Sequence, residues 1–101
     1  MSSYCDMEMR EKFDKILNEN KLVVVSSTGC PPCKKIKKLF KDNSINFHET
    51  DITNPDNEDL FYCIYEKSKS RFVPQIFHNA NYIGGYTEGL SHFLEGKFNK
   101  N

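Results

Sequence analysis

The chain has 101 residues, 38% of them hydrophobic and 28% charged, which is typical of one soluble globular domain rather than a disordered segment. Its 14 basic and 14 acidic residues give a formal net charge of zero, which argues against a dedicated nucleic-acid-binding protein. No stretch approaches the ~18 apolar residues of a membrane span, and the first residues are polar and acidic, unlike a signal or transit sequence. We therefore expect a single domain over 1–101 with loose tails at 1–6 and 99–101, a cytoplasmic monomer that binds neither nucleic acid nor membrane.

The first half of the chain is predicted to alternate helices and strands. Apolar residues recur at helical spacing from Met9 to Leu17, which predicts an amphipathic helix over ~7–18. The continuous apolar, β-branched run at 22–25 indicates a strand buried on both faces. A second helix starts at about Pro31, and the alternation of apolar and polar residues over 45–51 predicts a half-buried strand.

The second half is predicted to hold a helix, two short strands and a last helix. Asn54 and Pro55 predict a helix start, because Asn caps helices and Pro is tolerated at the first helical position, and this helix runs to about Lys67. Strands at 75–78 and 82–83 flank a turn, and Thr87 can cap the last helix. A βαβ unit followed by a ββα unit predicts an α/β fold, with a small four-stranded mixed sheet and helices on both faces.

A Cys-Pro-Pro-Cys motif occupies 30–33, where the buried strand passes to a helix. Cys30 falls at the helix N-cap, where free backbone N–H groups and the helix dipole favour a thiolate and should lower the pKa of the Cys30 thiol. Two lysines follow the motif and add positive potential. Cys33 lies one turn further into the helix, shielded from outside attack, and can close a disulfide with Cys30.

The other cysteines and the histidines bear on a competing interpretation, a zinc site, which needs four ligands at suitable spacing. Cys63, His48 and His92 are scattered along the chain and form no second ligand pair, so the strand-then-helix context favours redox chemistry, and we expect no metal. Cys63 is expected to be a small residue on the buried face of a helix. Cys5 lies in the expected tail and is predicted to be exposed and incidental.

Four motifs together resemble the glutaredoxin family in order and spacing. They are Thr-Gly-Cys-Pro-Pro-Cys at 28–33, Asp-Ile-Thr at 51–53, Arg-Phe-Val-Pro-Gln-Ile-Phe at 71–77 and Ile-Gly-Gly-Tyr-Thr-Glu at 83–88. The resemblance covers roughly 9–97 and implies a thioredoxin fold. It also implies a glutathione-dependent thiol–disulfide oxidoreductase acting on protein–glutathione mixed disulfides and protein disulfides, with Cys30 as nucleophile, Cys33 as resolving thiol and glutathione as reductant.

The resemblance further implies which residues bind glutathione. Pro74 should follow a cis peptide bond and set the Val73 backbone opposite Cys30, where glutathione can pair with it like an added strand. Arg71 should bind the glycine end, while Thr87 and Glu88 should bind the γ-glutamyl end. The expected glutathione-binding set is Arg71, Val73, Pro74, Gly85, Tyr86, Thr87 and Glu88.

The chain departs from the family pattern at several positions around this site. Pro32 stands where most dithiol members carry Tyr, Ser27 where many carry Lys or Arg, and Phe72 where Thr is usual. A helix-three Gln is absent, with Phe61 and Tyr62 nearby. The clamp on the glycine carboxylate is therefore expected to depend mainly on Arg71, with a lysine from 34–38.

Two alternative functions compete with the glutaredoxin interpretation. A thioredoxin-type protein disulfide reductase typically has Trp just before the Cys-x-x-Cys motif, and this chain contains no Trp. The other alternative function is that of a module that binds a metal ion or an iron–sulfur cluster. Cluster binding in the family is typical when Gly or Ser follows the first cysteine, and Pro31 stands there instead.

Overall fold

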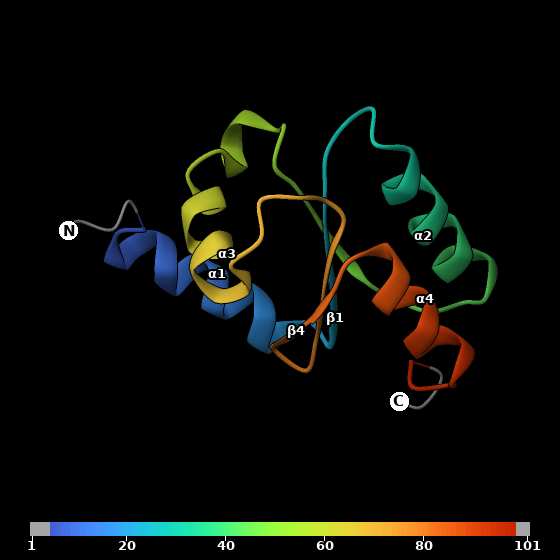
Figure 1. Ribbon diagram of the computed structural model, residues 1–101. Helices are drawn as coiled ribbons and strands as arrows, with labels where there is room; N and C mark the ends of the chain where they lie inside the picture. Colours follow the sequence, from blue (N-terminus) through green and yellow to red (C-terminus); the bar gives the residue numbers. More distant parts are fainter. Residues whose placement is uncertain (1–4, 99–101) are drawn as a thin grey trace.

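One four-stranded sheet, in the order β2-β1-β3-β4, organises the computed structural model, which describes residues 5–98 (Figure 1). The elements in chain order are α1 (Met7–Glu19), β1 (Leu22–Ser26), α2 (Pro31–Asp42), β2 (His48–Asp51), a 3-10 turn η1 (Pro55–Asn57), α3 (Leu60–Ser68), β3 (Gln75–His78), β4 (Asn81–Gly84) and α4 (Tyr86–Leu94). Within residues 5–98, no helix is both long and apolar enough to cross a membrane.

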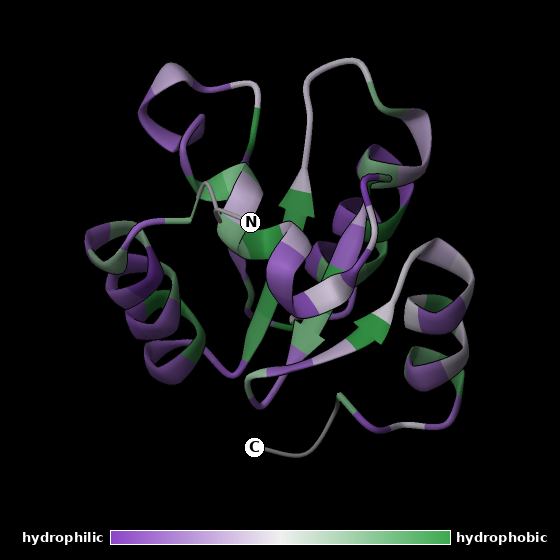
Figure 2. Ribbon diagram, turned by 60° about the vertical axis from the view of Figure 1, so that its left-hand side comes forward, coloured by the Kyte–Doolittle hydropathy of each residue, from purple (hydrophilic) through white to green (hydrophobic). Residues whose placement is uncertain are grey.

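The central strand β1 explains the layered arrangement. It pairs in parallel with β2 and antiparallel with β3, and β4 adds to β3 antiparallel, so the predicted mixed sheet is confirmed. Side chains alternate along β1: Val23 and Val25 pack with α1 and α3, whereas Leu22 and Val24 pack with α2 and α4. Because β1 is buried on both faces, its sequence is continuously apolar. The predicted placement of helices on both faces is confirmed (Figures 1 and 2).

Aromatic contacts fill both layers between the sheet and the helices. On the α1 and α3 side, Phe13 meets Phe77 edge to face, with ring centroids 5.5 Å apart. On the α2 and α4 side, Phe40 meets Phe98 at 5.4 Å in the same geometry. Such pairs add to the stabilisation that comes from burying apolar area.

Two predicted elements differ from the structure in extent. Asn54 caps as expected, its side chain accepting the Asp56 N–H at 2.9 Å, but a 3-10 turn forms first and the α-helix begins only at Leu60. The intervening polar residues offer no apolar face to pack on the sheet, and helices in proteins owe most of their stability to that packing. Similarly, β2 begins at His48 rather than Ile45, because β1 pairs with β2 only from Val23 opposite His48.

The prediction of an exposed, incidental Cys5 is wrong. Cys5 is buried and forms a disulfide with Cys63 of α3, with their Cα atoms 4.8 Å apart. Its carbonyl accepts from Arg10, which also binds Glu66 of α3 through two hydrogen bonds. Asp6 caps α1 by accepting the Met9 N–H. Residues 5 and 6 therefore belong to the domain, while the expected tails at 1–4 and 99–101 lie outside the described residues.

Candidate active site

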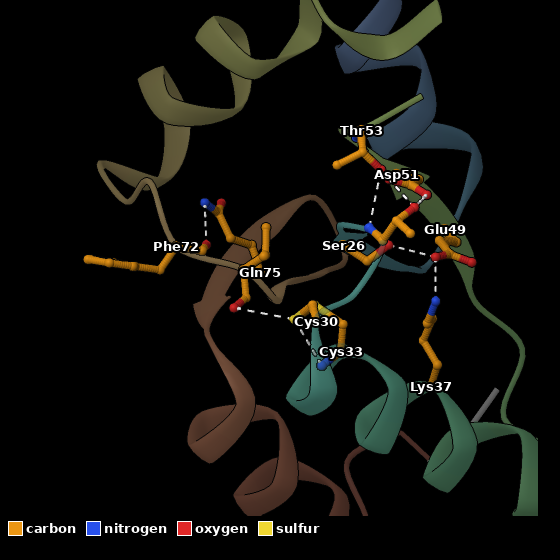
Figure 3. Close-up of a disulfide and its surroundings, with 11 residues drawn as sticks. Ser26, Cys30, Cys33, Lys37, Glu49, Asp51, Thr53, Phe72 and Gln75 are labelled. Carbon is orange, nitrogen blue, oxygen red and sulfur yellow. Dashed lines mark hydrogen bonds and ion pairs between the residues drawn. A yellow bond between two sulfur atoms is a disulfide. The ribbon is translucent and has the colours of Figure 1, made fainter. Parts of the chain in front are cut away.

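The Cys30–Cys33 pair lies at the start of α2, after the loop that follows β1, as predicted (Figure 3). The connecting loop turns through Gly29, whose φ of +78° is a left-handed conformation that glycine adopts without strain. Cys30 is the N-cap of α2, and its Sγ accepts the Cys33 N–H at 3.2 Å. In this structure the two cysteines are joined by a disulfide, with Cα atoms 5.2 Å apart.

The two sulfur-bearing residues differ in their access to solvent. Cys30 is 8% exposed, whereas Cys33 is 0% exposed against the α2 and α4 side of the sheet. A large reagent can therefore approach only Cys30. When the disulfide is reduced, the N–H groups at the start of α2 favour a thiolate at the same position, so the more accessible sulfur is also the better nucleophile.

The segment before β3 faces Cys30. The Val73–Pro74 peptide bond is cis, as predicted, and the Val73 carbonyl oxygen lies 3.9 Å from Cys30 Sγ. Strand pairing begins only at Gln75, so Val73 takes no part in either ladder of β3. The Gln75 side chain is buried and its Nε2 donates to the carbonyl oxygens of Ser70 at 2.7 Å and Phe72 at 3.1 Å. Sequence inspection missed this anchor, although a glutamine in a buried strand is a signal for such a role.

The glycine pair brings the start of α4 against the cis proline. A Cβ atom placed on Gly85 would lie 3.3 Å from the Pro74 carbonyl oxygen, so only glycine permits this approach comfortably. Gly85, not Thr87, is the N-cap of α4, which corrects the predicted capping role of Thr87. The Glu88 carboxylate supplies the cap by accepting the Gly85 N–H at 2.8 Å, and this hydrogen bond lowers the pKa of Glu88. Thr87 is instead an exposed second residue of the helix.

The remaining residues predicted to bind glutathione differ in their exposure to solvent. Tyr86 is half-buried and packs against the core on the α2 and α4 side. Arg71 is exposed, and its guanidinium carbon lies 5.6 Å from the centre of the Tyr65 ring on α3. The structure therefore brings Val73, Pro74 and Gly85 together beside Cys30, while Arg71 lies on the α3 side.

The lysines of α2 are not equally available to a ligand. Lys37 forms an ion pair with Glu49 and Lys38 one with Asp42. Among residues 5–98, Lys34 and Lys35 have no ion-pair partner, and both are exposed near the start of α2. Either lysine can therefore meet an anion near Cys30 without breaking an ion pair.

A polar network supports the loop that precedes Cys30. The Asp51 carboxylate accepts the Thr53 N–H at 2.8 Å and hydroxyl bonds from Thr53 and Thr28, and the Thr53 hydroxyl also accepts the Thr28 N–H at 3.1 Å. The bonds from Thr53, followed by that from Thr28, lower the pKa of Asp51. The loop is thereby tied to the end of β2, so Cys30 stands on an ordered segment. This network was not predicted from the sequence.

A second polar group joins the second turn of α2 to the sheet. Glu49 accepts from Ser26 Oγ at 2.6 Å and from Lys37 Nζ at 2.5 Å. Partial burial acts to raise the pKa of Glu49, but the bonds from Lys37 and Ser26 outweigh it, and the net shift is downward. The contact links β1, β2 and α2 (Figure 3).

Metal-binding clusters and surface hollows were compared with the position of the cysteine pair. Within residues 5–98, no group of three His, Cys, Asp or Glu side chains could hold a metal ion. A surface hollow of about 390 Å³ is lined in part by Leu22, His48 and His78. These residues lie at the end of the sheet opposite Cys30, so the hollow is separate from the redox centre.

Comparison with known proteins identifies the family. The glutaredoxin family model matches residues 22–83, a span that includes the Cys-Pro-Pro-Cys motif and the cis proline. The chain belongs to the glutaredoxin family. This glutaredoxin is 31% identical over 87 residues to the mitochondrial glutaredoxin-2 of Homo sapiens, covering 85% of this chain and 53% of that protein. It is 32% identical over 88 residues to glutaredoxin-C2 of Arabidopsis thaliana, covering 86% of this chain and 79% of that protein. The chain thus spans about half the length of the mammalian mitochondrial relatives that it matches.

Solved glutaredoxins share the fold. A buckwheat glutaredoxin–glutathione complex superposes with a TM-score of 0.80 at 26% identity, covering 90% of this glutaredoxin and 84% of that chain. A wheat glutaredoxin gives a TM-score of 0.81 at 26% identity, covering 97% of this glutaredoxin and 92% of the wheat chain. The dithiolic glutaredoxin 2-C-Grx1 of Trypanosoma brucei brucei gives a TM-score of 0.72 at 31% identity, covering 84% of this glutaredoxin and 89% of that chain. The predicted thioredoxin fold of the glutaredoxin type is therefore confirmed.

Proposed function

We propose that this glutaredoxin is a glutathione-dependent thiol–disulfide oxidoreductase that reduces protein–glutathione mixed disulfides and protein disulfides. The observation that carries the proposal is the position of Cys30, which caps α2 with its Sγ bonded by the Cys33 N–H and is the more accessible of the two paired cysteines. In the reduced protein this geometry favours a thiolate on Cys30 and leaves Cys33 as its internal partner.

Reduction of a glutathione mixed disulfide needs Cys30 alone. The Cys30 thiolate attacks the glutathione sulfur, the substrate disulfide breaks, and the substrate cysteine leaves as a thiolate that takes a proton from water. A second glutathione thiolate then attacks the glutathione sulfur on Cys30. Glutathione disulfide forms, and Cys30 leaves as a thiolate stabilised by the start of α2. The substrate disulfide is reduced, and two glutathione sulfurs end in one disulfide.

Reduction of a protein disulfide also uses Cys33, as the thiol that resolves the mixed disulfide on Cys30. Cys30 attacks one substrate sulfur, the substrate disulfide breaks, and the other substrate sulfur leaves as a thiolate. The Cys33 thiol then loses its proton to water and attacks Cys30, which releases the second substrate thiolate and closes the Cys30–Cys33 disulfide. The cysteines lie on one helical turn, so this intramolecular attack has a large effective concentration. Two glutathione molecules then restore the dithiol and leave as glutathione disulfide.

Glutathione binding is proposed at the surface beside Cys30. Its cysteine backbone would pair with Val73, and its glycine carboxylate would meet Arg71 with Lys34 or Lys35. Its γ-glutamyl end would lie at the start of α4, at Gly85, Tyr86, Thr87 and Glu88. The proposal is supported by the approach of Val73 to Cys30 Sγ, by the exposure of Arg71, and by similarity to the buckwheat protein solved with glutathione.

The same proposal covers location and assembly. We place this glutaredoxin in the cytoplasm, where glutathione is an abundant reductant, and treat it as a monomer. Fractionation of cells that produce the tagged chain would test the location, and sedimentation at several concentrations would test the assembly state.

The decisive experiment is a comparison of two substrates with the Cys33→Ser variant. We expect it to keep at least half of wild-type activity on a small glutathione mixed disulfide, because glutathione from solution resolves Cys30. On insulin it should lose at least nine-tenths of its activity and accumulate a covalent adduct, because the internal resolving thiol is gone. Cys30→Ser is the matched control and should be inactive on both substrates.

Other outcomes would point to the alternatives. Loss of both activities in Cys33→Ser, with wild-type turnover supported by thioredoxin reductase rather than glutathione, would replace the proposal with a thioredoxin-type reductase. An iron–sulfur chromophore with stoichiometric iron after anaerobic reconstitution would support a cluster-binding role, against the expected absence of a metal.

A further inference from the structure

The surface beside Cys30 carries an aromatic ring that the proposed chemistry does not use. Phe72 directly precedes Val73 and is 82% exposed, more than any other large hydrophobic residue within 5–98. Figure 3 shows its side chain projecting away from the Cys30–Cys33 disulfide rather than packing on the body of the domain. A single exposed apolar residue is common in proteins, so the case for a role depends on how Phe72 is held and what surrounds it.

The backbone of Phe72 is fixed from inside the domain. The buried Gln75 side chain donates to the Phe72 carbonyl oxygen at 3.1 Å, and the Phe72 N–H donates to Ser70 Oγ at 3.2 Å. Gln75 also donates to the Ser70 carbonyl oxygen at 2.7 Å. An exposed ring on an ordered backbone loses little further entropy when a partner covers it, which favours its use as a contact.

The neighbouring side chains suit contact with a polypeptide. Arg71 directly precedes Phe72 in the chain and lies over the ring of Tyr65, and both Arg71 and Tyr65 are exposed. Aromatic residues and arginine are the types that contribute most binding energy at protein interfaces. We call Tyr65, Arg71 and Phe72 the aromatic patch.

We propose that the aromatic patch binds the polypeptide around the reacting cysteine of a disulfide substrate, and that Phe72 favours substrates with an apolar side chain next to that cysteine. The inference rests on the proposed function and adds a substrate preference to it. A substrate cysteine bonded to Cys30 must lie over Val73, whose carbonyl oxygen is 3.9 Å from Cys30 Sγ. Neighbouring Cα atoms are ~3.8 Å apart and Phe72 adjoins Val73, so a residue flanking that cysteine passes the position of Phe72.

Glutathione gains little from the same contact. Its two residues other than cysteine are a γ-linked glutamate and a glycine, neither of which has an apolar side chain to place on Phe72. Within the patch, Arg71 also serves the proposed glutathione site, whereas Phe72 contacts the polypeptide and not the reductant. Phe72 is therefore a specificity residue for the substrate alone.

The test measures one chemical step with two peptides. Reduced Cys33→Ser protein is mixed with pentapeptides whose central cysteine carries a 2-thiopyridyl group and is flanked on both sides by Leu or by Ser. The Cys30 thiolate attacks the peptide sulfur, a Cys30–peptide disulfide forms, and pyridine-2-thione leaves and is measured by its absorbance. We expect the Leu peptide to react about five- to tenfold faster than the Ser peptide, which corresponds to about 1–1.4 kcal/mol and is smaller than the effect of an interface hot spot.

Substitution of Phe72 should abolish that preference. In a Phe72→Thr background, which carries the residue usual in the family, the two peptides should react within about twofold of each other. Phe72→Tyr should keep the preference. Leu94→Thr, at the far end of α4 and 72% exposed, is the matched control and should leave the preference unchanged.

A small reagent separates failure of this inference from failure of the proposed function. The reaction with 2,2′-dipyridyl disulfide should be fast and equal in all these variants, because it reports only the Cys30 thiolate. If that reaction is no faster than with a free thiol, the proposed function fails. If it is fast but wild-type residue 72 gives no preference, or Phe72→Thr retains it, the patch does not bind substrate. Self-association that depends on Phe72 would instead make the patch an interface between copies and would overturn the inference.

Discussion

The Cys5–Cys63 disulfide should contribute a large part of the stability of this domain. The bond links residues separated by 58 positions, and in the chain-entropy treatment a loop of that length lowers the entropy of the unfolded chain by about 14 cal/mol/K, or ~4 kcal/mol at 25 °C. Small domains are stable by only about 5–15 kcal/mol in total. Cys5→Ala or Cys63→Ala should therefore lower the free energy of unfolding by ~4 kcal/mol and the melting temperature by roughly 15–30 °C.

The structure also predicts what these variants keep. Helix α1 remains attached to α3 through Arg10 and Glu66 and through the Phe13 ring in the core, so the helix should stay formed in the folded variant. The double variant Cys5→Ala with Cys63→Ala should cost little more than either single one, because both single changes remove the same bond.

The assay is urea unfolding without reductant in a background where Cys30 and Cys33 are both replaced by Ser. Only Cys5 and Cys63 then remain, since the chain has four cysteines in all. Alkylation of this protein in denaturant should label no thiol before reduction and two after it. A loss below about 1 kcal/mol in the single variants, with the disulfide shown to be closed, would refute the entropic argument.

Three further predictions concern the site and its supporting loop. In the reduced protein the Cys30 thiol should titrate below the free-cysteine pKa of ~8.5, measured by the pH dependence of alkylation, and a value at or above it would contradict the helix-cap mechanism. Arg71→Ala should raise the KM for glutathione about five- to tenfold with little change in the Cys30 pKa. Adding Ser27→Lys to that variant should partly restore glutathione binding. If neither change alters the KM for glutathione, the carboxylate clamp lies on the lysines of α2. Because hydrogen bonds lower the pKa of Asp51 in the folded state, its stabilising effect is present above the unfolded pKa and is lost as the pH falls through the folded pKa. Asp51→Asn should thus cost about 1 kcal/mol near pH 7 and almost nothing in strong acid, whereas an equal cost at both pH values would rule out the charged carboxylate as the cause.

Local sequence determined the order of the elements and the position of the thiol pair. The run at 22–25 has no polar residue, and a strand that must be apolar on both faces can lie only in the middle of such a sheet. Cys30 before two prolines predicted a helix cap, because the preferences of helix starts depend on residues that are adjacent along the chain. Where a helix start depended on packing instead, as for Leu60 after the 3-10 turn, the sequence pattern placed it too early.

Tertiary structure alone decided which distant residues meet. Cys5 appeared to lie in a tail, yet it is buried against Cys63 because α1 packs on α3. The requirement for Gly85 follows from its distance to the Pro74 carbonyl oxygen, and the fixed position of Phe72 from a buried glutamine on the following strand. The physical reason is the same in each case. Periodicity and capping record the interactions of residues that are neighbours along the chain, whereas a disulfide, a close backbone approach or an anchored loop depends on a partner that only the folded sheet and its helices bring near.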